Sequence, residues 1–280
     1  MTATLVGIRQ KIDRAKYHLS DLHGVFNASI GARQAAHAEF AKHQADGQST
    51  ISVPDPPAEW ALIIGDTVSN LRASLDHLAC QLAILNGKHF SACAQTEFPI
   101  HSENNSVSEK AFKKIRPYLT PKAIAQVEFF QPYNGNNSGT PEDNIRTDLY
   151  RLAKLDNINK HRLLVVVDEW TILKSVDLTV EGVKQRIDLK NPVWQRLKDR
   201  TETVMYVVLA PKDASTVPAD APPPKMNVNS QYSLDIAFNE TGGVCDHAAV
   251  FPAIGRIVAS VTAVVDTFDK LFFCHSSLPD

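Results

Sequence analysis

A run of polar residues inside the largely apolar segment 58–86 is the first place in this chain where chemistry could occur. The apolar stripe of the segment predicts a helix, and another side of that helix carries Asp66, Asn70 and His77. A solvated helix face would carry Lys and Glu, and this face carries neither, so we expect it to be buried. Because buried polar groups need hydrogen-bonding partners, the face is interpreted either as the lining of a cleft or as a structural network between helices. Titratable groups in such surroundings favour the cleft.

Arg72 and Asp76 lie four residues apart on the same predicted helix. Side chains at this spacing are neighbours on a helix surface, so the two are expected to form an ion pair. The pair would hold the guanidinium in a fixed position beside His77. The alternative interpretation of the same spacing is a surface or interface ion pair without a catalytic role.

A second polar cluster ends the helix predicted at 142–161. The cluster consists of Asp156, Asn157, Lys160, His161 and Arg162. Asn157 and His161 are four residues apart and share one face. Asp156 and Lys160 form another pair with this spacing. Basic residues in a last turn also suit the helix dipole, which is the alternative explanation of 160–162. We expect His161 and Asn157 to join the polar face of the first cluster.

Several helices must position these residues. Apolar residues that recur every three or four positions predict the longer ones, and Thr120 before Pro121 predicts the start of a shorter one. The predicted helices are 4–45, 58–86, 108–118, 121–130, 142–161 and 248–273. The first, second, fifth and last are expected to pack together as a bundle.

The sequence pattern changes after Arg162, where Val, Ile, Tyr and Thr become frequent, as is typical of strands. The predicted strands are 163–173, 175–182, 203–210 and 226–239, with a short one at 49–53. The predicted fold class is therefore α+β, a helical bundle with an antiparallel β-sheet elaboration packed on it. The expected organisation is a helical bundle region at 1–162, a β-rich segment at 163–239 and a C-terminal helix at 240–280 that returns to the bundle, all in one compact domain.

The composition restricts the partners and the location. The net charge is −2, so a broad nucleic-acid surface is not expected and any RNA contact must be local. No apolar run reaches the ~18 residues that a membrane span needs, so we expect no membrane partner. The four cysteines lack C-x-x-C spacing, and Cys80 in an apolar helix is interpreted as a free thiol. We therefore expect a reducing, cytoplasmic location.

The segment 70–77 contains Arg72 and, five positions later, His77, which is the pattern Arg-x4-His on a predicted bundle helix. This pattern resembles the signature of the HEPN superfamily, a set of helical bundles of which many are metal-independent endoribonucleases in bacterial defence and toxin–antitoxin systems. A wider pattern resembles a group of uncharacterised bacterial proteins. In this chain the wider pattern comprises residues 65–77, 98–100 and 157–162.

The resemblance implies a metal-independent endoribonuclease or an RNA-binding protein. His77 would act as general base or general acid, and Arg72 would stabilise charge on the phosphate. The candidate catalytic residues are Arg72, His77, Asp76, Asp66, Asn70 and His161, and the candidate substrate-binding residues are Asn157, Lys160 and Arg162. Two copies of the motif meet at a dimer interface in that superfamily, so a homodimer with RNA as partner and without a cofactor is implied.

Two other classes of function remain open. A metal-dependent small-molecule enzyme or binding protein would use Asp66, His77 and His161, a mixture of imidazole and carboxylate suited to Zn or Fe. A non-catalytic interaction protein would use the polar face only to fix the register of the helices.

Overall fold

The computed structural model describes ten ranges of the 280-residue chain. These are 2–42, 50–52, 57–136, 138–161, 166–180, 183–196, 201–203, 226–239, 243–245 and 248–273. For 33–42 and for the strand residues up to 235, only the backbone is described. The chain divides into two compact units. The first unit contains Met1–Gly24, Pro57–Val167 and Phe238–Asp280, and the second contains Val25–Pro56 and Asp168–Ala237.

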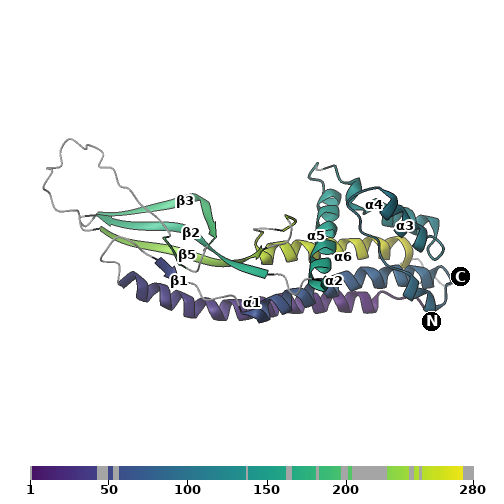
Figure 1. Cartoon of the computed structure of the whole chain (residues 1–280), viewed down its shortest axis with the longest axis horizontal. Helices are drawn as coiled ribbons and strands as arrows, with labels where there is room; N and C mark the ends of the chain where they lie inside the picture. The colour runs from purple at the N-terminus through teal and green to yellow at the C-terminus, as the bar shows by residue number, and fades with distance from the viewer. Residues whose placement is uncertain are drawn as a thin grey trace. The chain divides into compact units, whose positions relative to one another are not determined.

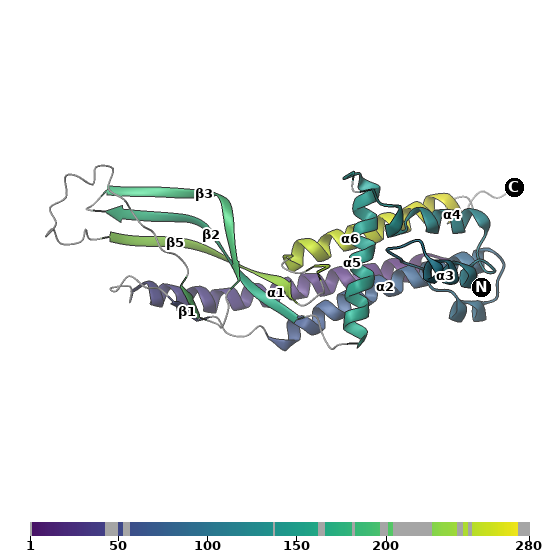
Figure 2. The ribbon, with the colours of Figure 1, turned by 45° about the horizontal axis from the view of Figure 1, so that its top comes forward.

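The first unit is a helical bundle. Its long helices are α2 (Ala58–Leu85), α5 (Pro141–His161), α6 (Val250–Phe268) and the beginning of α1 (Val6–Lys42). The prediction of these four helices is confirmed. α5 crosses both α2 and α6 (Figures 1 and 2), and the three helices contact one another. The side chains buried in this core are aliphatic and aromatic, and include Val68, Leu71, Leu75, Leu152, Val261 and Phe268.

The first turns of α1 are attached to two other helices. Arg9 forms ion pairs with Asp266 at 2.9 Å and Asp269 at 2.7 Å, at the end of α6. The backbone N–H of Thr4 donates to Gln81 Oε1 of α2 over 2.8 Å. Arg9 and both carboxylates are partly exposed, so each ion pair stabilises the fold only modestly. Most of the stabilisation comes from the burial of apolar area on the inner face of α1. The residues buried on that face are Leu5, Ile8, Ile12, Ala15 and Leu22.

Shorter helices connect α2 to α5. They are η1 (Phe90–Gln95), α3 (Ser106–Ile115), α4 (Pro121–Phe129) and η2 (Pro132–Asn134), and η3 (Asp269–Phe273) follows α6. α3 begins with a capping box formed by Asn105 and Ser108. α4 begins as expected, because the hydroxyl of Thr120 accepts from the backbone N–H of Ala123 and Pro121 occupies the first turn.

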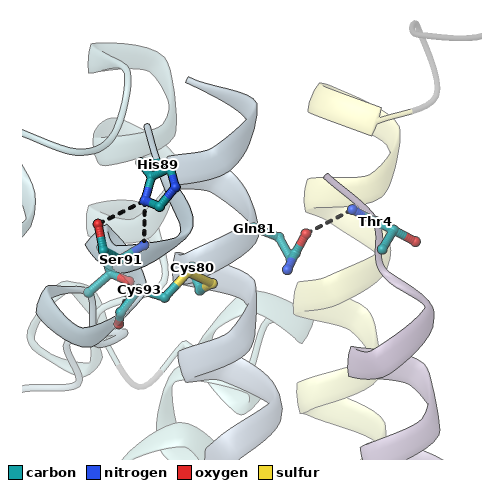
Figure 3. Close-up of a disulfide and its surroundings, with 7 residues drawn as sticks. Thr4, Cys80, Gln81, His89, Ser91 and Cys93 are labelled. Carbon is teal, nitrogen blue, oxygen red and sulfur yellow. Dashed lines mark hydrogen bonds between the residues drawn. A yellow bond between two sulfur atoms is a disulfide. The ribbon is translucent and has the colours of Figure 1, made fainter. Parts of the chain in front are cut away.

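A disulfide joins Cys80 of α2 to Cys93 of η1 (Figure 3). The prediction that Cys80 is a free thiol is wrong, because the fold brings the two Cα atoms to 4.6 Å, a separation that a disulfide spans. Sequence spacing reports only local cysteine motifs and misses this pairing. Disulfides persist mainly in oxidising compartments, so the argument from Cys80 to a reducing compartment loses its basis. The cytoplasmic location stays a prediction.

Most strand residues belong to the second unit. The strands are β1 (Thr50–Ser52), β2 (Val166–Val180), β3 (Val183–Arg196), β4 (Thr201–Thr203) and β5 (Met226–Asn239). β2 pairs antiparallel with β3, with a register shift between Leu173 and Ser175. The two strands predicted at 163–173 and 175–182 are thus one strand with an irregularity. Of the strand predicted at 203–210, the structure describes only Thr203.

The α+β fold class is corrected to a mainly helical one. Among the residues whose side chains the structure describes, helix dominates, and strand is limited to the short end of β5 at 236–239. An antiparallel sheet packed on the bundle is therefore not shown. The physical reason is that β-branched composition reports a local preference for extended backbone. That preference carries no information on which compact unit the strands join.

Within the ranges that the structure describes, one helical segment, Val250–Phe273, is long and apolar enough to cross a membrane. The core helix of a soluble protein satisfies the same criteria, and 50% of the relevant window is buried inside the structure. α6 contacts α2 and α5 along this segment. The segment is therefore weak support for a membrane span, and the expected lack of a membrane partner stays a prediction.

Candidate ligand-binding cavity

A cavity of about 340 Å³ lies in the first unit beside α2. Its wall is formed by α2, the segment 97–101, α3 and the end of α5. The apolar part of the lining consists of Phe98, Pro99, Ile100, Ala111, Ile115 and Ala153. Sites for small molecules usually occupy about 300–1,000 Å³. The cavity therefore suits a compact ligand.

Arg72 of α2 lines this cavity and is only 7% exposed. Its Nη2 atom lies 3.1 Å from Asp76 Oδ1, which confirms the expected ion pair four residues along the helix. The same Nη2 donates to Glu97 Oε1 over 3.0 Å and to the Phe98 carbonyl oxygen over 2.9 Å. Nη1 is buried and donates to no acceptor among the described residues. Because a guanidinium presents a planar fork of donors that matches carboxylate and phosphate oxygens, Nη1 has the capacity to bind an anion.

The side chain of Asp76 links Arg72 to the irregular segment 97–101, which follows η1. Asp76 Oδ1 accepts from the backbone N–H of Phe98 over 3.0 Å, so one carboxylate oxygen contacts both the guanidinium and this backbone. Burial raises the pKa of Asp76, while the charge of Arg72 and the Phe98 N–H oppose the increase. Arg72 is thus held by acceptors on one side of its guanidinium, and its rotamer is fixed before any ligand arrives.

Gln131 fixes the rest of the segment 97–101. This side chain is fully buried. Its Nε2 donates to the Pro99 carbonyl oxygen over 2.7 Å, and its Oε1 accepts from the His101 backbone N–H over 3.1 Å. These two bonds replace the backbone partners that the irregular segment lacks. The segment therefore forms a rigid wall of the cavity.

α5 supplies a buried acid to the same cavity. Asp156 is 4% exposed, and its Oδ2 accepts from Lys160 Nζ over 2.7 Å. This confirms the ion pair that the spacing of the two residues predicts. Asp156 Oδ1 is buried and accepts no hydrogen bond from any described residue. Asn157 and His161, both exposed, complete the contribution of α5 to the lining.

The lining carries charges of both signs. Its cations are Arg72, Lys114 and Lys160, and its acids are Glu97 and Asp156, so three positive and two negative groups leave a formal charge of +1. Burial lowers the pKa of His101; Glu97 opposes this shift and Arg72 adds to it. A neutral imidazole both donates and accepts hydrogen bonds. The site is therefore weakly cationic and rich in groups that orient a polar ligand.

Four of the predicted site residues meet in this cavity. They are Arg72, Asn157, Lys160 and His161. Asp76 lies behind Arg72 as its partner. His161 and Asn157 thus share a cavity with Arg72, whereas the polar face that they were expected to join, Asp66, Asn70 and His77, does not line it. Arg162 lies outside the described residues.

Asp66 and Asn70 stand apart from the cavity. Asp66 is exposed and Asn70 is half-buried, so the prediction of a buried face is wrong for Asp66. The Asn70 Nδ2 donates to the Asp66 carbonyl oxygen of its own helix over 2.9 Å. The sequence argument failed because a helix face without Lys and Glu is not buried unless another element covers it.

His77 lies on another side of α2 from Arg72. It is exposed, so its predicted burial is also wrong. Five residues turn an α-helix by about 140° beyond one full turn, which carries His77 away from the cavity that Arg72 lines. Burial of part of the ring and the charge of Lys11 lower the pKa of His77, against the opposing charge of Asp76. The two residues of the Arg-x4-His pattern therefore do not share this cavity.

The alternative metal site receives no geometric support. Within the described ranges, no three His, Cys, Asp or Glu side chains are grouped so that they could hold a metal ion. Of the three ligands considered, His161 lines the cavity, whereas Asp66 and His77 do not.

Sequence reasoning missed three titratable residues of the lining: Glu97, His101 and Lys114. Glu97 and His101 flank the Phe98-Pro99-Ile100 run, which belongs to the wider pattern noted in the sequence. That run was the available signal, because it marks the backbone that contacts Arg72. Lys114 had no such signal, since a lysine near a helix end is ordinary.

No family model, characterised protein or solved structure matches this chain. The similarity to the HEPN superfamily therefore stays a prediction that depends on the motif alone.

Proposed function

We propose that this chain binds a small anionic organic molecule in the cavity around Arg72, either as a binding protein or as an enzyme that acts on that molecule. The observation that carries the proposal is the buried Nη1 atom of Arg72, which has no acceptor among the described residues. A buried donor without a partner costs ~1–3 kcal/mol. A carboxylate or phosphate oxygen would remove this cost and form a charge-assisted hydrogen bond.

The surroundings of Arg72 favour a compact ligand over an extended polyanion. Lys114 and Lys160 add positive charge around the cavity, which suits one anionic group. A chain of phosphates would be repelled by two acids of the lining, Glu97 and Asp156. The Glu97 side chain is 65% exposed, and Asp156 is buried. The mixed charges and the small volume therefore support a ligand with one or two charged groups.

Isothermal titration calorimetry against a panel of carboxylates and phosphate monoesters tests the proposal. Lys114→Ala removes one cation of the lining from an exposed position on α3, so the fold should persist. We expect the dissociation constant of any bound anion to rise by roughly 3–10-fold, because a partly exposed charge contributes about 1 kcal/mol. Lys113→Ala removes the neighbouring exposed lysine, which does not line the cavity, and is the matched control.

A result in which both lysine variants bind alike, or in which no member of the panel binds, contradicts the proposed function. Arg72→Lys gives an independent reading, because it keeps the positive charge and removes the fork. Loss of binding in Arg72→Lys with unchanged folding supports recognition through the fork.

Cleavage of RNA is the second candidate, and one observation favours it: Arg72 and His161 line the same cavity. An exposed imidazole and a guanidinium that line one cavity are a combination that could act on a phosphodiester. In this geometry His161 takes the part that the motif assigned to His77. A homodimer remains a proposal attached to this candidate, since the superfamily pattern needs a second copy.

A ribonuclease assay with chelator present separates these alternatives. If RNA is cleaved in the cavity, His161→Ala should remove most of the activity. If RNA is cleaved by the Arg-x4-His residues, His77→Ala should remove most of the activity instead. Absence of activity in the wild-type protein rules out both forms of the second candidate and leaves the small-molecule proposal unaffected.

A further inference from the structure

We infer that the ligand of this cavity carries, besides its anionic group, a hydrogen-bond donor nitrogen that binds Asp156 Oδ1. This inference rests on the proposed function and specifies the class of ligand. It predicts a compact molecule with an acidic group at one position and an amino or ammonium group at another.

The observation is a second unsatisfied atom on a residue that lines the same cavity. Asp156 is 4% exposed, its Oδ2 is occupied by Lys160, and its Oδ1 is buried without a donor among the described residues. A carboxylate oxygen accepts hydrogen bonds and donates none when ionised. The complementary ligand group is therefore an N–H or O–H donor, and an amine satisfies both the charge and the hydrogen bond.

The two unsatisfied atoms have opposite character and come from different helices. Arg72 Nη1 on α2 offers donors, and Asp156 Oδ1 on α5 offers an acceptor. A purely anionic ligand would satisfy the first atom and face an uncompensated acid at the second. A ligand with both groups satisfies both, and its orientation in the cavity is then fixed by two contacts.

Two chemical sources carry this combination: amino acids and nucleotides with an amino-substituted base. The shared chemistry is an anion plus a donor nitrogen. Two matched pairs of probes distinguish the sources. L-glutamate differs from glutarate by its amino group, and adenosine 5′-monophosphate differs from purine riboside 5′-monophosphate by its exocyclic amino group.

The experiment is calorimetric titration of the full-length wild-type protein with the four probes. We expect the amino member of one pair to bind about 10-fold or more tightly than its partner, since a hydrogen bond to a charged group contributes this much. The pair that discriminates identifies the source. Because this comparison uses only wild-type protein, it holds even where a variant fails to fold.

Asp156→Asn provides the second reading. It should reduce the preference for the amino member to roughly twofold or less, because the amide accepts without a charge. Asp148→Asn is the matched control: Asp148 is a buried acid of the same helix, paired with Arg151 and with Ser260, outside the cavity. It should leave the preference unchanged.

Equal dissociation constants for both members of each pair would overturn this inference while leaving anion binding intact. A preference that survives Asp156→Asn would also overturn it. The proposed function itself would be rejected if none of the four probes binds. It would also be rejected if Arg72→Lys and Lys114→Ala both leave the dissociation constants unchanged.

Discussion

Arg72 on α2 and Asp156 on α5 line one cavity, and each keeps a buried polar atom without a hydrogen-bonding partner among the described residues. One other terminal atom of each group has partners. Nη2 of Arg72 meets three acceptors, and Oδ2 of Asp156 meets Lys160. The unsatisfied atoms are thus the ends of otherwise fixed groups, which is the arrangement expected of a preorganised ligand site.

Replacement of Arg72 should destabilise the bundle. Arg72→Gln leaves the half-buried Asp76 without its cation. We expect the free energy of unfolding to fall by about 3 kcal/mol. This value is at the lower end of the range for breaking a buried pair, because Asp76 is not fully buried. Urea denaturation measures the change. Arg116→Gln breaks an exposed pair with Glu109 and should cost much less, because solvent screens this pair. Equal losses in the two variants would contradict the buried role of Arg72.

The disulfide should contribute substantially to stability. Cys80 and Cys93 are separated by 13 residues, and closing a loop of this size contributes about 3 kcal/mol in the chain-entropy description. We therefore expect the Cys80→Ser/Cys93→Ser double variant to lose about that amount in urea denaturation. Reductant should destabilise the wild-type protein similarly and leave the double variant unchanged. A wild-type protein insensitive to reductant would show that the bridge is absent.

Gly65 permits the end of α5 to approach α2. A Cβ atom at Gly65 would lie 2.5 Å from Asn159 Oδ1, and the Asn159 Nδ2 also bonds to Ser69 Oγ over 3.3 Å. We expect Gly65→Ala to destabilise by about 1 kcal/mol, because overpacking exceeds the gain in helix propensity. In an Asn159→Ala background the same substitution should instead stabilise by up to about 1 kcal/mol. Urea denaturation measures both changes in the free energy of unfolding. If Gly65→Ala changes this free energy in the same direction in both backgrounds, the close approach is contradicted.

Acid pH should affect stability through Asp143. The Ser138 hydroxyl, together with Arg146 and nearby backbone N–H groups, lowers the pKa of Asp143 to about 2 from its ordinary value of 3.8. Between these values the unfolded chain binds more protons than the folded one, so this group adds stability as the pH rises from about 2 to 3.8 and loses it as the pH falls. Urea denaturation at several pH values should show a shallower rise for Asp143→Asn than for wild type. Parallel profiles would contradict the shift.

Local features of this fold could be predicted from the sequence. The helices follow from apolar spacing, the start of α4 follows from Thr120, and the ion pair of Arg72 with Asp76 follows from a separation of four residues. Each of these depends on neighbours within about one helical turn. The predictions succeeded where the deciding interaction was local.

The remaining features depend on contacts between distant residues. Burial of Arg72 and exposure of His77 depend on which side of α2 the segment 97–101 and α5 cover, and no residue of α2 encodes that choice. The bond between Cys80 and Cys93 has the same origin. The strands were recognised locally, but the compact unit that they join is a property of long-range packing.

A crystal structure of the wild-type protein with the tightest-binding anion from the panel tests the central claim most directly. The account predicts a carboxylate or phosphate oxygen within about 3 Å of Arg72 Nη1 inside the cavity. An anion bound elsewhere would contradict the account. So would an Nη1 atom that a residue outside the described ranges already occupies.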